Sequence, residues 1–419
     1  MPRLKEIDMD KRRFGYGMYI VIALAILLTL FYDTFQPRSI ETVAVISGMG
    51  IEKGQDKALK LTVQIIKPGA GSSSDGNDAS SVTISANGDT VSEACEDLVA
   101  KTGSVLFWSH CAVVIIKKDL AKTDDMVKHL DLFFRSSNFR NTSAVIFSDE
   151  SPQDVLEATT LSETVSAFGI RKLMDDQEYE SNSVYTTVKR FVKDYYSQSG
   201  CGVVTGVELV ELGNSGSDTD ESRTERSVSL GNVSIVKDGK YVDVLNDEEF
   251  NGYKWLTDTM RARTVTLTDV TLESENNEKN DLGFTLFRGN TRIKPIYDNG
   301  KYILKVTVSA TAELIYVKNE LQSKNISTYK LNKRYEEMGK LVAQNIQYEM
   351  RQALDKMALK DCDFCGIDDI FYSYLGKQWN GDKYENIEQM LDDIEFEMEY
   401  DITVTSGGLN KRYKLKNLK

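Results

Sequence analysis

The sequence predicts an α+β fold of three mixed α/β domains with antiparallel sheets, preceded by one N-terminal transmembrane helix. Three observations lead to this prediction. A long uncharged apolar run lies near the N-terminus, polar low-complexity stretches divide the rest, and strand-like alternation is interleaved with helical periodicity. A length of 419 residues fits two or three domains, at roughly 150 residues per domain.

The apolar run Phe14–Tyr32 carries no charge and is dense in Ile, Leu, Val and Ala. Its length is close to the roughly 20 residues that a helix needs to cross a bilayer core. Lys11, Arg12 and Arg13 directly precede it, and positive residues stay on the cytoplasmic side of a membrane. We therefore expect a single-pass anchor in the lipid bilayer, with the N-terminus cytoplasmic and the chain from residue 36 outside.

A cleaved signal peptide and a buried core helix are the two alternatives to an anchor. A cleaved signal peptide would end in a small-x-small signal, but this run ends in Leu30-Phe31-Tyr32-Asp33. No cysteine stands directly after the run to carry a lipid. A buried core helix is the other alternative, and the flanking positive charges favour the anchor over it.

Three polar stretches cannot bury apolar surface, and we expect them to be loops or linkers: Gly69–Asn77, Leu212–Ser227 and Glu273–Asn280. They suggest the boundaries of the domains. The expected organisation is a basic tail at 1–13, the anchor at 14–35, an N-terminal α+β domain at 36–200, a middle domain at 201–270, and a C-terminal domain of antiparallel sheet plus helices at 271–419.

Strands and helices alternate in the N-terminal domain. Strands are expected, by their β-branched or apolar content, at Thr42–Ile51, Leu59–Lys67, Ala112–Ile116 and Thr142–Phe147. A capping box at Thr90 and Glu93 opens a helix that should stop at Gly103. A second helix over Asp124–Arg135 should bury Val127, Leu130, Phe133 and Phe134, and Ser151-Pro152 should open a third.

Glycine turns predict two hairpins further along the chain. Asp238-Gly239 separates the strands Asn232–Val236 and Tyr241–Leu245, and Asn299-Gly300 separates Thr291–Tyr297 from Lys301–Val317. Helices are expected over Asp247–Met260 and Tyr329–Met357. A closing strand, Ile394–Val404, should place its apolar residues on one face and Glu395, Glu397 and Glu399 on the solvent face.

The charge of the chain excludes one class of partner. A net charge of −13 and a pI near 4.9 leave no basic face for a phosphate backbone, so nucleic acid is not expected to bind. Only Asn410–Lys416 is locally basic. A solvated tail is the first interpretation of that run, and contact with anionic lipid headgroups is the second.

The sequence also lacks the residues of an enzyme site. His110 and His129 are the two histidines, and His110 is expected to be a core or rim residue. Gly48-Met49-Gly50 lacks the third glycine of a dinucleotide loop, and no Walker, HExxH or EF-hand motif occurs. We therefore expect no catalytic residues, no cofactor and no metal.

The chain has five cysteines, which is a small and odd number, so a disulfide framework is not expected. Cys362 and Cys365 form a CxxC without the second ligand pair of a zinc site and without a thioredoxin-like setting. This pattern favours a pair without function, with a disulfide as the second reading.

Several segments, taken in order, resemble the Ger(x)C family, the C subunits of nutrient germinant receptors in endospore-forming bacteria. The matching stretches are Val45–Glu52, Leu61–Pro68, Leu106–His110 leading into Val113–Ile116, Asp131–Arg135 with Arg140, Asp247–Gly252 before Trp255-Leu256, and the long C-terminal helix followed by Cys365-Gly366 and Trp379.

The resemblance implies three α+β domains outside the spore inner membrane, beside a multi-pass A subunit and a transporter-like B subunit. Family members are usually lipoproteins with a lipid-modified cysteine after the signal sequence, and because this chain has no such cysteine we expect a protein helix to replace the lipid. The implied role is a non-enzymatic receptor subunit that acts through protein contacts, and whether it binds the germinant stays open. A free-standing envelope solute-binding or sensor protein is the alternative.

Gln64, Arg140 and Glu249 are the candidate partner contacts within these stretches. A surface ion pair or a helix cap would explain Arg140 and Glu249 equally well. Gly252 is expected to serve close packing rather than contact.

Overall fold

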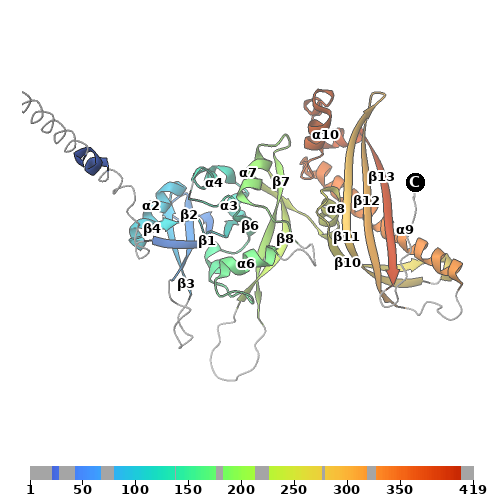
Figure 1. The fold of residues 1–419 in the computed structure, drawn as a ribbon, viewed down its shortest axis with the longest axis horizontal. Coiled ribbons are helices and arrows are strands. Elements are labelled where there is room, and N and C mark those ends of the chain that lie inside the picture. Colours follow the sequence, from blue (N-terminus) through green and yellow to red (C-terminus); the bar gives the residue numbers. More distant parts are fainter. Residues whose placement is uncertain are drawn as a thin grey trace, which may run out of the picture.

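The computed structural model describes residues 21–27, 43–67, 80–136, 138–175, 183–212, 226–275, 279–318 and 327–406. Within these residues the strands form two sheets that lie side by side along the long axis of the molecule (Figure 1). The first sheet is built from the N-terminal half of the chain, and the second sheet is built from the C-terminal half.

The first sheet contains nine strands in the described residues. These are β1 (Val43–Lys53), β2 (Leu59–Ile66), β3 (Ser81–Gly88), β4 (Val105–Phe107), β5 (Val113–Lys117), β6 (Ala144–Ser148), β7 (Cys201–Glu211), β8 (Arg226–Lys237) and β9 (Lys240–Val244). Their order is β3-β2-β1-β5-β6-β7-β8-β9, and β4 pairs with the start of β1.

Helices cover both faces of this sheet. They are α2 (Val91–Thr102), α3 (Lys118–Ala121), α4 (Met126–Arg135), α5 (Pro152–Glu157), α6 (Ser166–Asp175) and α7 (Val188–Tyr195). In β5, Val114 and Ile116 pack in the core formed with α2, α3, α4 and α7, whereas Val113 and Ile115 pack in the core with α5 and α6. This two-sided burial explains why the strand is apolar throughout.

The expectation of antiparallel sheets is wrong for the centre of the first sheet. β1 pairs in parallel with β5, β5 with β6, and β6 with β7, while the outer pairs are antiparallel. The helices between these strands carry the chain back across the sheet, so each next strand starts at the same end as the last. The sheet is therefore mixed.

The strands of the expected middle domain, 201–270, divide between the two sheets. β7, β8 and β9 complete the first sheet, and β10 (Ala262–Thr271) begins the second. The helix α8 (Asp247–Leu256) lies between them in sequence and shares one core with both parts. Apolar residues of β7 and β8, such as Val203 and Ile235, are buried in that core, which leaves these strands no separate interior.

The second sheet has the order β10-β11-β12-β13, where β11 is Lys279–Asp298, β12 is Lys301–Val317 and β13 is Ile394–Ser406. Asn299 and Gly300 have φ of 49° and 82°, the left-handed values of the predicted hairpin turn. The expected antiparallel closing strand is wrong, since β13 pairs in parallel with β12. The reason is the helical crossover through α9 (Thr328–Lys360), α10 (Ile367–Leu375) and α11 (Ile387–Asp392).

Alternation along β12 determines which face of the second sheet the helices cover. Leu304, Val306 and Val308 are buried with Val342 and Ile346 of α9 in one core. The intervening residues of β12 are partly exposed on the other face. An antiparallel hairpin followed by a long helix therefore gives a sheet with helices on one side, as the periodicity predicts.

Local signals placed the helix ends well. Thr90 accepts a hydrogen bond from the Glu93 amide (3.2 Å), and Gly103 ends α2 with φ of 63°. The Glu93 carboxylate accepts from the amide of Asp89 (2.7 Å) rather than from that of Thr90. One prediction for α4 is wrong, because Phe134 is 37% exposed while Phe133 faces the core.

The predicted anchor Phe14–Tyr32 falls largely outside the described residues. Residues 21–27 are helical with exposed apolar side chains. In the part of the chain that the structure describes, no helix combines the length and the apolar character that crossing a membrane requires. The basic run Asn410–Lys416 also lies outside the described residues.

Candidate interaction surface

An open apolar groove of about 510 Å³ lies between α2 and β4 at one corner of the first sheet. Val99 and Val105, from its two sides, are 42% and 45% exposed. Exposed apolar residues scattered singly are normal, but a cluster beside a groove indicates a contact surface. The groove is lined by Cys95, Glu96, Val99, Ala100, Val105, Leu106 and Trp108.

The local sequence explains how this groove forms. The chain turns at Gly103 and enters β4, which pairs in parallel with Val43–Val45 of β1. Val105 and Phe107 alternate with Leu106, so both point to the exposed face of the short strand. Trp108 then anchors the strand, because its ring meets that of Phe133 at 4.9 Å in an edge-on arrangement.

The titratable residues in and near the groove bear on whether it could be a reactive site: Cys95 lines it, and His110 and His129 are the two histidines of the chain. Burial, aided by the charge of Glu96, raises the pKa of the Cys95 thiol to about 12, so the thiolate form is scarce at neutral pH. His110 is exposed next to the ring of Phe107, at 5.7 Å between centroids. His129 lies near the Asp124 carboxylate, at 3.4 Å. No group of three or more His, Cys, Asp or Glu among the described residues could hold a metal ion.

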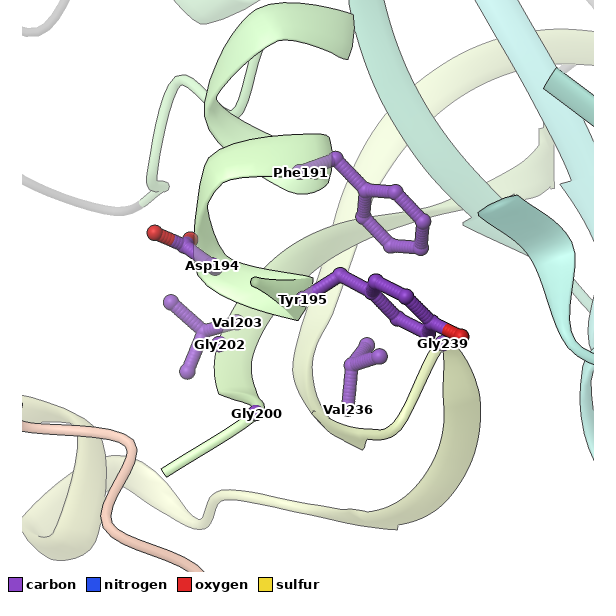
Figure 2. A pocket seen from close by; sticks show the side chains of 8 residues that line it. All are labelled: Phe191, Asp194, Tyr195, Gly200, Gly202, Val203, Val236 and Gly239. Carbon is purple, nitrogen blue, oxygen red and sulfur yellow. The ribbon is translucent and has the colours of Figure 1, made fainter. Parts of the chain in front are cut away.

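A second hollow lies between α7 and the strands β7 and β8, and its volume is only about 10 Å³ (Figure 2). That space fits one water molecule and no organic ligand. Figure 2 shows the Phe191 and Tyr195 rings on one side of α7 and Asp194 on the other. Burial raises the pKa of Asp194 to about 6, against the opposing effect of Arg190, whose Nε is 3.6 Å away.

α7 and the neighbouring strands form the joint between the two sheets. Arg190 donates a hydrogen bond from Nη2 to the Tyr253 hydroxyl of α8 (3.0 Å). The Gln198 amide donates to Asp369 of α10 (3.3 Å), and Lys237 forms an ion pair with Asp361 after α9 (2.9 Å). These contacts hold the first sheet to the helices of the second.

A disulfide between Cys201 and Cys362 crosses the same joint. This pairing corrects the sequence interpretation, which considered Cys362 only with Cys365. Cys201 and Cys362 are 161 residues apart in sequence, and their Cα atoms are 5.9 Å apart, within the normal range for a disulfide. Cys365 is a buried free thiol whose pKa burial raises well above the ordinary value.

Gln64 does not lie on the surface and cannot be a partner contact in this fold. It is 2% exposed, and its Nε2 donates to the Leu156 carbonyl (2.8 Å). Its Oε1 accepts from the Ser47 hydroxyl (3.0 Å) and from the Ala167 amide (3.1 Å). The side chain therefore connects β1 and β2 to α5 and α6.

Glu249 is a helix cap, one of the two alternatives that the sequence left open. Asn246 and Glu249 form a complete capping box at the start of α8, with both hydrogen bonds at 2.8 Å. Lys356 of α9 lies 3.5 Å from the same carboxylate. A Cβ on Gly252 would overlap the Glu349 carbonyl of α9, so this glycine allows close helix packing as expected.

Arg140 is the candidate contact that does lie on the surface, just before β6. It lies near Tyr185. Burial raises the pKa of Tyr185, and the positive charge of Arg140 opposes that rise. The structure thus brings none of the three candidates together. The α2–β4 groove was missed, although Val105 and Phe107 alternate directly after the helix-ending glycine.

Comparison with known proteins supplies the family. Residues 36–209 match the family "Spore germination protein N-terminal domain", and residues 231–408 match "Spore germination B3/ GerAC like, C-terminal". Similar proteins from Bacillus subtilis (strain 168) include spore germination protein KC, which is 21% identical over 89% of this chain and 91% of the relative. Spore germination protein B3, from the same organism, is 21% identical over 93% of this chain and 96% of the relative.

The crystal structure of the GerBC protein shares the fold. It aligns with a TM-score of 0.50 and 18% identity over 86% of this chain and 97% of that one. Two family matches in sequence order span both sheets of the described structure. The chain therefore belongs to the Ger(x)C family of spore germination proteins.

Proposed function

We propose that this protein is a non-enzymatic, membrane-anchored subunit of a spore nutrient-germinant receptor complex and acts through protein contacts. The observation that carries the proposal is the pair of family matches, which cover residues 36–209 and 231–408 in order. Membership of a family of spore germination proteins supports a role in germination. The apolar α2–β4 groove supports action by contact.

The proposed location is the spore inner membrane, with a cytoplasmic N-terminus and the two sheets on the outer face. The uncharged run Phe14–Tyr32 and the basic residues before it support this orientation. Residues 33–42 separate the run from β1 and span at most about 40 Å when fully extended. Because β4 pairs with the start of β1, the groove lies at the end of the chain's first strand that follows the proposed anchor, which supports contact with partners in the same membrane.

The proposed partners are the membrane-embedded A and B subunits of the receptor. A groove lined by apolar side chains, with Glu96 as the charged residue among those that line it, suits a partner surface that is itself apolar. Because the groove lies close to residues 33–42, which follow the proposed anchor, proteins in the same membrane would be within its reach. Deletion of the chain should therefore abolish the response to at least one germinant.

The test is a double substitution, Val99→Asp with Val105→Asp, which places charge on both sides of the groove. Recovery of the A and B subunits with the chain from spore membranes should fall at least 10-fold, as should the germination rate. Leu173→Asp is the matched control, since Leu173 is an exposed apolar residue on α6, across the sheet. All variants should remain in the membrane fraction in equal amounts.

Two results would overturn the proposal. One is an intact response to every germinant after deletion, together with no partner recovered with the chain. The other is a soluble mature product that begins near residue 36, which would remove the anchor.

A further inference from the structure

The second sheet has two edge strands among the described residues, β10 and β13, and they differ in regularity. The register of β10 with β11 shifts between Leu267 and Val270, where Asp269 has a left-handed φ of 55°. Such a bulge is one of the devices by which proteins interrupt an edge. β13 has 13 residues and pairs with β12 over its whole length without a shift. Figure 1 shows it at the outer edge of the sheet.

The length and composition of β13 also leave its edge unprotected. Proteins commonly shield an edge strand by making it short or by placing proline or lysine in it. β13 contains no proline, lysine, arginine or glycine. The strands at the two ends of the first sheet, β3 and β9, have only eight and five residues. In the part of the chain that the structure describes, β13 is therefore the longest regular row of backbone donors and acceptors that no strand covers.

The two faces of β13 determine which side chains an added strand would need. Ile402 and Val404 are buried on the helix-covered face, and the apolar residues before them on that face are only partly buried. The other face carries a carboxylate at every second position, from Glu395 to Asp401. Because directly opposite residues of neighbouring strands lie on the same face, the added strand would need apolar residues on one face and basic residues on the other.

The sheet itself already pairs this acidic row with a basic row on its inner side. Lys301 of β12 pairs with Glu395 (3.2 Å), and Lys305 of β12 pairs with Glu399 (2.8 Å). The Oδ1 of Asp401 is shielded from solvent and accepts no hydrogen bond from the described residues. An oxygen in that state is costly, so a donor that reached it would be stabilising. A basic strand on the outer side would repeat the arrangement that β12 provides on the inner side.

A second copy of β13 does not meet this requirement. If two copies paired antiparallel with their apolar faces on the same side, carboxylates of one copy would stand opposite carboxylates of the other. Like charges directly opposite one another destabilise a strand pair. The acidic row therefore disfavours self-association at this edge and favours a different partner of opposite charge.

We propose that β13 is a docking edge for an extended segment of another protein, in which lysine or arginine alternates with apolar residues. Backbone hydrogen bonds to the edge provide affinity, and the side chains of the two faces provide specificity. This inference goes beyond the proposed germination role. It concerns the second sheet, whereas the α2–β4 groove lies on the first.

A synthetic peptide of nine residues, in which lysine alternates with valine and both ends are capped, is the probe. When labelled with a fluorophore, it should bind the full-length chain in detergent saturably, one peptide per chain. Glu395→Lys with Glu397→Lys should weaken binding at least 10-fold, because both exposed side chains lie on the acidic face. Glu208→Lys with Glu211→Lys, at exposed positions of β7, is the charge-matched control and should bind like the parent chain.

Methylation of the peptide backbone separates strand pairing from charge attraction. A strand turns only alternate amides toward one neighbour, so the lysine amides and the valine amides of the peptide face opposite sides. One peptide is methylated on the lysine amides and another on the valine amides, and both keep every charge. One of the two should lose binding at least 10-fold and the other should retain it. The one that is lost also reports the direction of the bound strand.

Four outcomes would overturn the proposal. Equal binding by the two double variants would reduce the interaction to net charge. Binding that survives both methylations, or neither, would exclude pairing at one edge. Dimers of the chain that the peptide dissociates would assign the edge to a second copy. A lack of saturable binding to the full-length chain would mean that the edge accepts no added strand.

Discussion

At the scale of single residues, burial separates the candidate contacts from one another. Gln64, Arg140 and Glu249 are all polar residues within family-like stretches. In the fold, Gln64 is buried, Glu249 caps a helix and Arg140 is exposed. The sequence does not show whether a polar side chain of a strand is exposed to solvent or, like Gln64, hydrogen-bonded to three partners inside the protein.

Gln64→Leu should lower the free energy of unfolding by about 2–4 kcal/mol, because it leaves the Leu156 carbonyl and the Ala167 amide buried without their partner. Denaturant unfolding of the purified chain measures this. Arg140→Ala is the control and should change stability by no more than about 0.5 kcal/mol. Equal stability of the two variants would contradict the structural role assigned to Gln64.

At the scale of elements, α7 connects the core of the first sheet to the joint. Val188, Phe191 and Val192 face the core, while Arg190 reaches the Tyr253 hydroxyl of α8. Asp194 is a partly buried carboxyl that comes close to β7, where a Cβ on Gly202 would stand 2.9 Å from its oxygen. We therefore expect the stability of this joint to depend on pH.

Burial raises the pKa of Asp194 from 3.8 to about 6, so the folded state holds this proton more tightly than the unfolded chain does. The stability that the neutral carboxyl contributes is complete below about pH 4 and is lost as the pH rises to about 6. Asp194→Asn should remove this loss, so that the stability difference from the parent chain changes by about 1–2 kcal/mol across that window.

Unfolding curves at pH 4, 5, 6 and 7 check this expectation. Asp175→Asn, at an exposed carboxylate on α6, is the control for the loss of one carboxylate. Asp363 is fully buried, and burial also raises its pKa to about 6. It therefore contributes a similar pH dependence of stability to the parent chain and to both variants. Parallel curves for the parent and Asp194→Asn would refute the assignment.

At the scale of the whole molecule, the two sheets are joined by a shared core and by the disulfide Cys201–Cys362. The cross-link connects the first residue of β7 to the segment that follows α9. Because it closes a loop of 161 residues, it restricts the unfolded chain strongly. This observation reverses the expectation that the CxxC cysteines are dispensable.

Cys362→Ser should therefore lower stability by about 2–5 kcal/mol, read as a lower Tm or denaturant midpoint. A reductant should lower the Tm of the parent chain by a similar amount and should leave Cys362→Ser unaffected. Cys95→Ser, at a free cysteine of the groove, should behave like the parent. Identical melting of the parent chain with and without reductant would contradict the role of this bond.

The sequence by itself determined the local elements. Glycine turns, capping residues and periodicity placed both hairpins, α2, α8 and α9 close to their observed positions, because these signals act within a few residues. Family-like segments in order also pointed to the correct family. Strand direction, the division of 201–270 between two sheets and the pairing of Cys201 with Cys362 were decided only by the tertiary structure. Those features depend on which distant segments share a core, and no local pattern encodes that choice.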